Sequence, residues 1–130
     1  MKRALRLFLC LAVISTPLTA LAERLEVFRW QALEGKGEQL VGALLQAAKL
    51  HEKSGAKVGI FQMDVGVPGG ATFDYVLRWD SSSEWATTKA YNSSDEWMAF
   101  VNEVTKTPSG ELMMSLEGLN WDASVTAASF

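Results

Sequence analysis

The sequence has 130 residues, with 12 Lys and Arg, 15 Asp and Glu, one His and one Cys, and a formal net charge of −3. Removing the first 22 residues, which resemble a leader with three basic and no acidic side chains, leaves 108 residues with a charge of −6. This length suits one ordinary domain. The acidic charge argues against a nucleic-acid partner, because phosphate contacts need clustered Lys and Arg. Cys10 lies in the leader, so a disulfide framework is also excluded.

Residues 1–22 are predicted to form a signal peptide. Three basic residues precede an apolar run at residues 7–14, and Ala20-Leu21-Ala22 is typical of a cleavage site. The apolar run is much shorter than the ~20 residues that span a bilayer. We therefore expect a periplasmic or secreted protein with no membrane insertion after cleavage. An uncleaved N-terminal anchor is the alternative.

The first half of the mature chain predicts two strands around one helix. Residues 25–31 are rich in β-branched and aromatic side chains, which favour a strand. Residues 38–53 carry apolar side chains at three- and four-residue spacing, which is the pattern of a helix with one buried face. Residues 57–65 predict a second strand, and the glycines and proline of residues 66–70 predict a loop.

The second half predicts two further strands around a broken helix. Residues 72–79 alternate cleanly and predict a strand. Ser81 with Glu84, and Ser93 with Glu96, each have the spacing of a capping box, so we expect a short helix at 85–91 and a break near Asn92 before a second helical stripe. A fourth strand is expected at residues 111–119 and a loosely held tail at 122–130.

The predicted element order is β-α-β-β-α-β. Right-handed crossovers on one sheet then give a ferredoxin-like α+β fold, with an antiparallel four-stranded sheet and two helices on one face. We assign this single domain to residues 23–121.

The two faces of the predicted sheet differ in composition. The strand at 72–79 turns its aromatic residues to one side, and this side suits the helices. The opposite side joins apolar residues, including Val27 and Val76, with the charged residues Arg29, Asp74 and Arg78. Such a mixture favours burial against a second subunit, with Asp74 depending on Arg78 for its charge pairing. Recognition of an anionic substrate by the two arginines is the alternative.

The sequence resembles the dimeric α+β barrel superfamily, whose members include antibiotic-biosynthesis-monooxygenase-like and NIPSNAP-like domains. The likeness is carried by Tyr75-Val-Leu-Arg-Trp-Asp, by the Ser-Ser-Ser-Glu-Trp-Ala that follows it, and by Tyr91-Asn-Ser-Ser-Asp-Glu-Trp-Met-Ala-Phe. The resemblance implies a homodimer with a pocket between sheet and helices. It implies no single chemistry, because the fold hosts cofactor-free oxygenases, haem enzymes, isomerases and plain binding modules.

Several side chains are candidates for the wall of such a pocket, since aromatic walls suit a flat organic ligand. They are Trp30, His51, Tyr75, Trp79, Trp85, Tyr91 and Asn92. For the aromatic residues the alternative is ordinary core packing. For the single imidazole, His51, the choice lies between a ligand or general base and a half-exposed residue near a helix C-terminus.

No cofactor and no metal are expected. The resemblance implies that a haem-binding relative places its ligand His on the second helix, where this chain has none. One His and no mature Cys cannot supply three nitrogen or sulfur ligands to zinc. No serine stands in the sequence of a nucleophile elbow either.

Three functions therefore stay open. The first is binding of a small organic ligand without catalysis. The second, implied by the resemblance, is a cofactor-independent monooxygenase or isomerase on an aromatic or polyketide-like substrate, for which Asn92, Tyr75, Trp85 and Arg78 are chemically suitable. The third is a structural interaction module. The enzyme needs a closed pocket of a few hundred Å³, roughly the size of known ligand sites, and a solidly packed sheet–helix interface would rule it out.

Overall fold

The computed structural model describes residues 23–63 and 71–120. The predicted signal peptide, the predicted loop and the predicted tail lie outside the described residues. The elements, in chain order, are β1 (Glu23–Ala32), α1 (Gly37–Lys53), β2 (Lys57–Met63), β3 (Thr72–Trp79), α2 (Ser82–Tyr91), α3 (Asp95–Lys106) and β4 (Gly110–Asn120). This order confirms the predicted ferredoxin-like α+β class.

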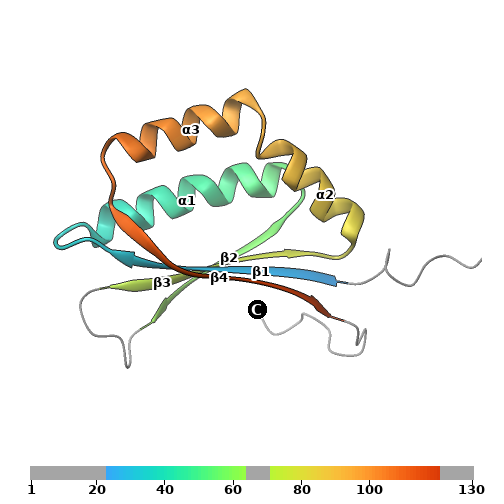
Figure 1. Ribbon diagram of the computed structural model, residues 1–130, viewed down its shortest axis with the longest axis horizontal. Coiled ribbons are helices and arrows are strands. Elements are labelled where there is room, and N and C mark those ends of the chain that lie inside the picture. The colour runs from blue at the N-terminus through green and yellow to red at the C-terminus, as the bar shows by residue number, and fades with distance from the viewer. Residues whose placement is uncertain (1–22, 64–70, 121–130) are drawn as a thin grey trace, which may run out of the picture.

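The four strands form one antiparallel sheet in the order β2-β3-β1-β4. The central pair is β1 and β3, as the predicted topology requires. All three helices cover the same face of this sheet, with α1 and α3 running along it and α2 at one end (Figure 1). Among the residues described, no helix combines the length and hydropathy needed to cross a bilayer.

The register of β1 and β3 decides which side chains face the helices. Phe28 pairs with Tyr75 and Trp30 with Phe73, and these four belong to the core or pack against it. In β3, residues 73, 75, 77 and 79 are all at most 4% exposed. Because side chains alternate along a strand, the neighbouring residues point to the opposite, helix-free face. The prediction that the aromatic set faces the helices is confirmed.

The helical segment between β3 and β4 is broken near Asn92, as the sequence predicts. The residue that caps its second helix, α3, lies one position later than predicted. Ser81 caps α2, accepting a hydrogen bond from the Glu84 backbone N–H at 3.2 Å. The cap of α3 is Ser94, which accepts from the Trp97 backbone N–H at 3.2 Å. The assignment of that role to Ser93 was therefore wrong, because the backbone of Ser93 still continues the turn that ends α2, with its N–H bonded to the Ala90 carbonyl.

The helix-free face carries the three charged residues of the expected dimer face, but their pairing differs from the prediction. Asp74 accepts two hydrogen bonds from Arg29, each 2.7 Å long. Arg78 instead donates to Glu23, with its Nε 3.0 Å from Oε1. The expectation that Asp74 depends on Arg78 was therefore wrong: Arg29 lies directly opposite Asp74 in the β1–β3 register.

Candidate functional site

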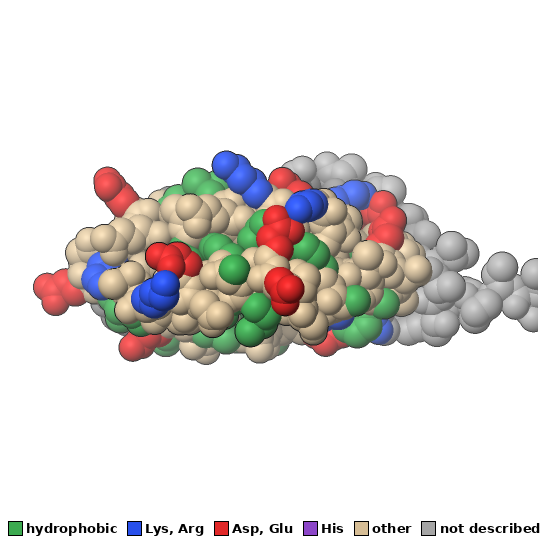
Figure 2. All heavy atoms as spheres, turned by 90° about the horizontal axis from the view of Figure 1, so that it is seen from above, with side chains coloured by type: hydrophobic (Ala, Val, Ile, Leu, Met, Phe, Trp, Pro, Cys, Tyr) green, Lys and Arg blue, Asp and Glu red, His purple; other side chains and the backbone are tan. Residues whose placement is uncertain are grey.

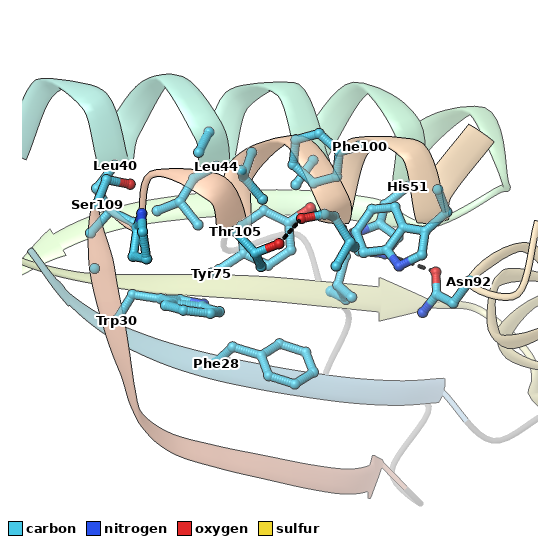
Figure 3. Close-up of a pocket in the computed structure, with 18 of the residues that line it drawn as sticks. Phe28, Trp30, Leu40, Leu44, His51, Tyr75, Asn92, Phe100, Thr105 and Ser109 are labelled. Atoms are coloured by element: carbon cyan, nitrogen blue, oxygen red, sulfur yellow. Dashed lines mark hydrogen bonds between the residues drawn. The ribbon is translucent and has the colours of Figure 1, made fainter. Parts of the chain in front are cut away.

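A cavity of about 500 Å³ lies between the helices and the sheet. Helix α3 turns an apolar stripe toward the sheet, but none of its residues is buried. The space between α3 and β1 is therefore not filled by side chains. Figure 3 shows Phe28 and Trp30 on the sheet side, with Leu44 and Phe100 on the helix side. A wide, partly open apolar space therefore lies between the helices and the sheet.

The body of the cavity is apolar. Its walls come from β1, β3, α1 and α3, and aromatic rings form much of the sheet side. The residues of this part are Phe28, Trp30, Leu40, Ala43, Leu44, Ala47, Leu77, Phe100, Val101 and Val104. Rigid rings opposite aliphatic side chains make a slot that suits a flat apolar molecule.

Three polar side chains meet at one end of the cavity, close to where α1 ends. His51 is 5% exposed and its Nδ1 lies 2.8 Å from the hydroxyl oxygen of Tyr75. Its Nε2 lies 3.2 Å from Oδ1 of Asn92, in the turn between α2 and α3 (Figure 3). The ring of Trp97 packs against the imidazole, with the two centroids 4.3 Å apart. The imidazole is thus fixed by contacts from β3, from α3 and from the turn between α2 and α3.

These contacts define the protonation state of the imidazole. A carbonyl oxygen only accepts hydrogen bonds, so with Oδ1 of Asn92 at Nε2 the proton is on Nε2. Nδ1 of a neutral ring then accepts the hydrogen bond that the Tyr75 hydroxyl donates. Burial lowers the pKa of His51 below its usual value of 6.5, although the Asn92 bond opposes this change. Burial also raises the pKa of Tyr75, so both groups are neutral at pH 7.

A buried ion pair adjoins this cluster. Glu26, on the helix-facing side of β1, is 3% exposed and lines the cavity. It accepts hydrogen bonds from Nζ of Lys89 and from Nε1 of Trp85, both at 2.8 Å. These contacts fasten α2 to the sheet and neutralise a carboxylate that would otherwise be buried without a partner.

Two donors at the polar end have no acceptor among the residues that the structure describes. They are the side-chain N–H₂ of Asn92 and the indole N–H of Trp97. Both residues line the cavity. Both N–H groups are accessible to solvent, because Thr72 Oγ1 is the one buried side-chain polar atom without a partner among the described residues. An oxygen atom of a bound molecule can therefore replace water as their acceptor.

The structure separates the predicted pocket candidates into two groups. Trp30, His51, Tyr75 and Asn92 line the cavity. The remaining three lie elsewhere: Trp79 is fully buried and donates to Thr88, Trp85 holds Glu26, and Tyr91 donates to Glu96. The half-exposed alternative for His51 was wrong, because α1 turns its last apolar positions, with His51 among them, toward the sheet.

Sequence reasoning missed four polar members of the wall: the charged residues Glu26 and Lys89, and the hydroxyl residues Thr105 and Ser109. One signal for Glu26 was present: it shares its side of β1 with Phe28 and Trp30, so an acidic residue stands on a face predicted to be buried. No comparable signal marked Lys89, whose side chain is 39% exposed and pairs with Glu26 at the edge of the cavity. Within the described ranges, no three His, Cys, Asp or Glu side chains gather as metal ligands.

No family model matches the sequence, and neither does any curated protein. Solved structures share the fold. An uncharacterised NIPSNAP-domain protein from Burkholderia xenovorans aligns with a TM-score of 0.59 at 15% identity, over 78% of this chain and 96% of that one. A NIPSNAP-family protein from Agrobacterium tumefaciens aligns with a TM-score of 0.58 at 14% identity, over 80% and 89%.

An oxygenase is also among the similar structures. SnoaB, a cofactor-independent oxygenase from Streptomyces nogalater, aligns with a TM-score of 0.50 at 11% identity, over 75% of this chain and 89% of SnoaB. Identities this low establish the fold alone. The chain therefore shares the ferredoxin-like α+β fold of the NIPSNAP structures and of SnoaB, which confirms at the level of the fold the resemblance seen in the sequence.

Proposed function

We propose that the mature domain is an exported homodimer that binds a small organic molecule in the cavity between sheet and helices. The observation that carries this proposal is the cavity itself, about 500 Å³ with a mainly apolar lining and the hydrogen-bonded His51, Tyr75 and Asn92 at one end. Known ligand sites of roughly 300–1,000 Å³ have this same composition. An empty apolar space of this size would weaken the core, since lost packing destabilises a fold.

The walls define the class of ligand. Aromatic rings from β1 and α3 favour a flat, mainly apolar molecule, and the unpaired donors of Asn92 and Trp97 favour an oxygen atom at one end of it. The ligand is therefore a flat ring system with a carbonyl or hydroxyl group that lies near His51.

Filling the cavity tests this proposal. Val101 lines it from α3, and Val101→Trp is expected to occupy the space of the ligand. Met98→Trp is the matched control, because Met98 is 45% exposed on the same helix and does not line the cavity. Isothermal titration with 2-naphthol is the measurement. We expect the wild type and Met98→Trp to bind alike, and Val101→Trp to bind at least about tenfold more weakly, roughly 1.4 kcal/mol. Equal binding by the two variants would place the ligand elsewhere.

Export and dimerisation rest on separate grounds. Residues 1–22 have the charge, apolar run and cleavage sequence of a signal peptide. Intact-mass measurement of extracytoplasmic protein should find a chain that begins at Glu23. The dimer is supported by the apolar and charged side chains of the helix-free face, and its test is given in the Discussion.

Cofactor-independent oxygenation or isomerisation is the second candidate function. It is favoured by the hydrogen-bonded His51, Tyr75 and Asn92 inside a cavity large enough for a substrate. Of the four side chains first considered suitable, Arg78 lies on the opposite sheet face and Trp85 does not line the cavity. Oxygen uptake in the presence of 1-naphthol tests the oxygenase form.

A pure interaction module is less well supported. It requires an apolar patch outside the dimer face, and the helix side shows apolar side chains interspersed with charged ones (Figure 2). The exposed apolar residues of the helices are Leu45 on α1 and Met98 on α3. Isolated apolar residues of this kind are normal on protein surfaces.

A further inference from the structure

We propose that Tyr75 and His51 transfer a proton to and from a carbon atom next to the carbonyl group of the bound molecule, so that the site interconverts a ketone and its enol. This inference rests on the proposed function, because it needs a ligand in the cavity. It extends that function from binding to a defined reaction and a substrate class: flat cyclic ketones with an acidic C–H bond.

The geometry of the pair carries the inference. The hydroxyl of Tyr75 donates to Nδ1 of His51 over 2.8 Å, and both residues line the cavity. His51 is held from its other side by Asn92 and by the ring of Trp97. A buried base, oriented by a second group and bonded to a hydroxyl that faces a ligand space, has the arrangement expected for general acid–base catalysis.

The reaction balances without a cofactor. Tyr75 passes its hydroxyl proton to Nδ1 of His51 while its oxygen takes the proton of the substrate C–H bond. The electron pair of that bond forms the C=C bond of an enolate, and the negative charge moves onto the carbonyl oxygen. Return of the proton from His51 through Tyr75 to the enolate oxygen gives the enol; its return to carbon restores the ketone.

The polar end also provides groups for the developing negative charge. The unpaired N–H groups of Asn92 and Trp97 are donors for the enolate oxygen. Donors that are already in place stabilise such a charge strongly where water is excluded. The same two residues contact His51, so the oxygen and the proton acceptor are held near each other.

Burial, more than the charged groups nearby, keeps the imidazole available as a base. Burial has the largest effect and lowers the pKa of His51. Of the charged groups nearby, Glu26 on β1 raises this pKa and Lys89 on α2 lowers it, and these two residues form an ion pair with each other. Tyr75 on β3 is neutral. His51 is thus unprotonated at pH 7 and ready to accept a proton.

Deuterium exchange tests the inference on the folded mature protein. The probe is 2-tetralone in D₂O, with deuterium entry next to the carbonyl measured by mass spectrometry and binding measured by titration calorimetry. We expect Tyr75→Phe and His51→Gln to bind the probe and to lose about 100-fold in the exchange rate at saturation, the typical contribution of a positioned acid or base. Met98→Trp, outside the cavity, should exchange at the wild-type rate.

The outcomes separate the two proposals. Binding of the probe with equal exchange by the wild type, Tyr75→Phe and His51→Gln would overturn the proton-transfer role and leave the binding function intact. Failure of both 2-tetralone and 2-naphthol to bind would overturn both. The pH profile adds a second criterion: wild-type exchange should stay level from pH 8 to below 6.5, whereas a decline centred at 6.5 or above contradicts a buried base.

Discussion

At the scale of single residues, His51 is the centre of the polar cluster in the cavity, since it contacts both Tyr75 and Asn92. The sequence shows one imidazole at the border of an apolar stripe near a helix C-terminus, and from this alone a half-exposed residue is favoured over a ligand or general base. The choice depends on Tyr75 and Asn92, which are 24 and 41 residues away along the chain. Only the tertiary structure, which places α1 and the turn between α2 and α3 beside β3, brings the three together.

The burial of His51 predicts a pH-dependent stability. Its pKa in the folded protein is below the 6.5 of the unfolded chain, so the unfolded chain binds a proton first as the pH falls. The free energy of unfolding contributed by this residue is complete above pH 6.5 and is lost as the pH falls from 6.5 toward the lowered pKa. Urea unfolding midpoints at pH 7.5, 6.5 and 5.5 should therefore decrease for the wild type, and decrease less for His51→Gln. Parallel pH curves for the two proteins would show that burial does not perturb this imidazole.

At the scale of elements, the boundaries follow local chemistry closely. Strand β3 occupies the predicted residues, and α1 begins one residue earlier than expected. Helix α1 ends where Gly55 adopts a φ of +102°, a left-handed conformation that glycine adopts without steric cost. Capping and turn signals of this kind act within a few residues, so a single sequence contains them.

The start of α3 tests whether its N-cap is Ser94 or the neighbouring Ser93. Ser94→Ala removes the side chain that accepts from the Trp97 N–H, and we expect a loss of about 1 kcal/mol in the free energy of unfolding. Ser93→Ala is the matched control, because its exposed side chain makes no hydrogen bond among the described residues. Its effect should be within a few tenths of a kcal/mol. Chemical denaturation measures the free energy of unfolding of both variants. A larger loss for Ser93→Ala than for Ser94→Ala would show that Ser93 is the N-cap, as the sequence predicted.

At the scale of the whole molecule, the helix-free face is the side of the sheet on which no helix of the described residues packs. It carries Val27 and Leu116, which are opposite each other in the β1–β4 register, beside the Arg29–Asp74 ion pair. Leu116 is 55% exposed. Covering such a face with a second copy would remove apolar area from water and leave the charges paired.

The proposed dimer gives a prediction at this scale. Leu116→Lys places a charge on the helix-free face and is expected to shift the protein toward monomer by at least tenfold in the dissociation constant. Leu45→Lys is the control, because Leu45 is similarly exposed, at 52%, but lies on α1. Sedimentation velocity over a concentration series measures both. A monomeric wild type, or equal dissociation by the two variants, would remove the dimer from the proposal.

The sequence by itself determined the order of the elements, the break near Asn92 and the faces of β1 and β3 that meet the helices. These properties follow from periodicity and from capping, which depend on neighbours close along the chain. The tertiary structure alone decided that Asp74 pairs with Arg29, that His51 bonds Tyr75, and that Glu26 and Lys89 adjoin a cavity under α3. Each of these depends on strand register or on the distance between a helix and the sheet, and such quantities are fixed only when distant segments pack together.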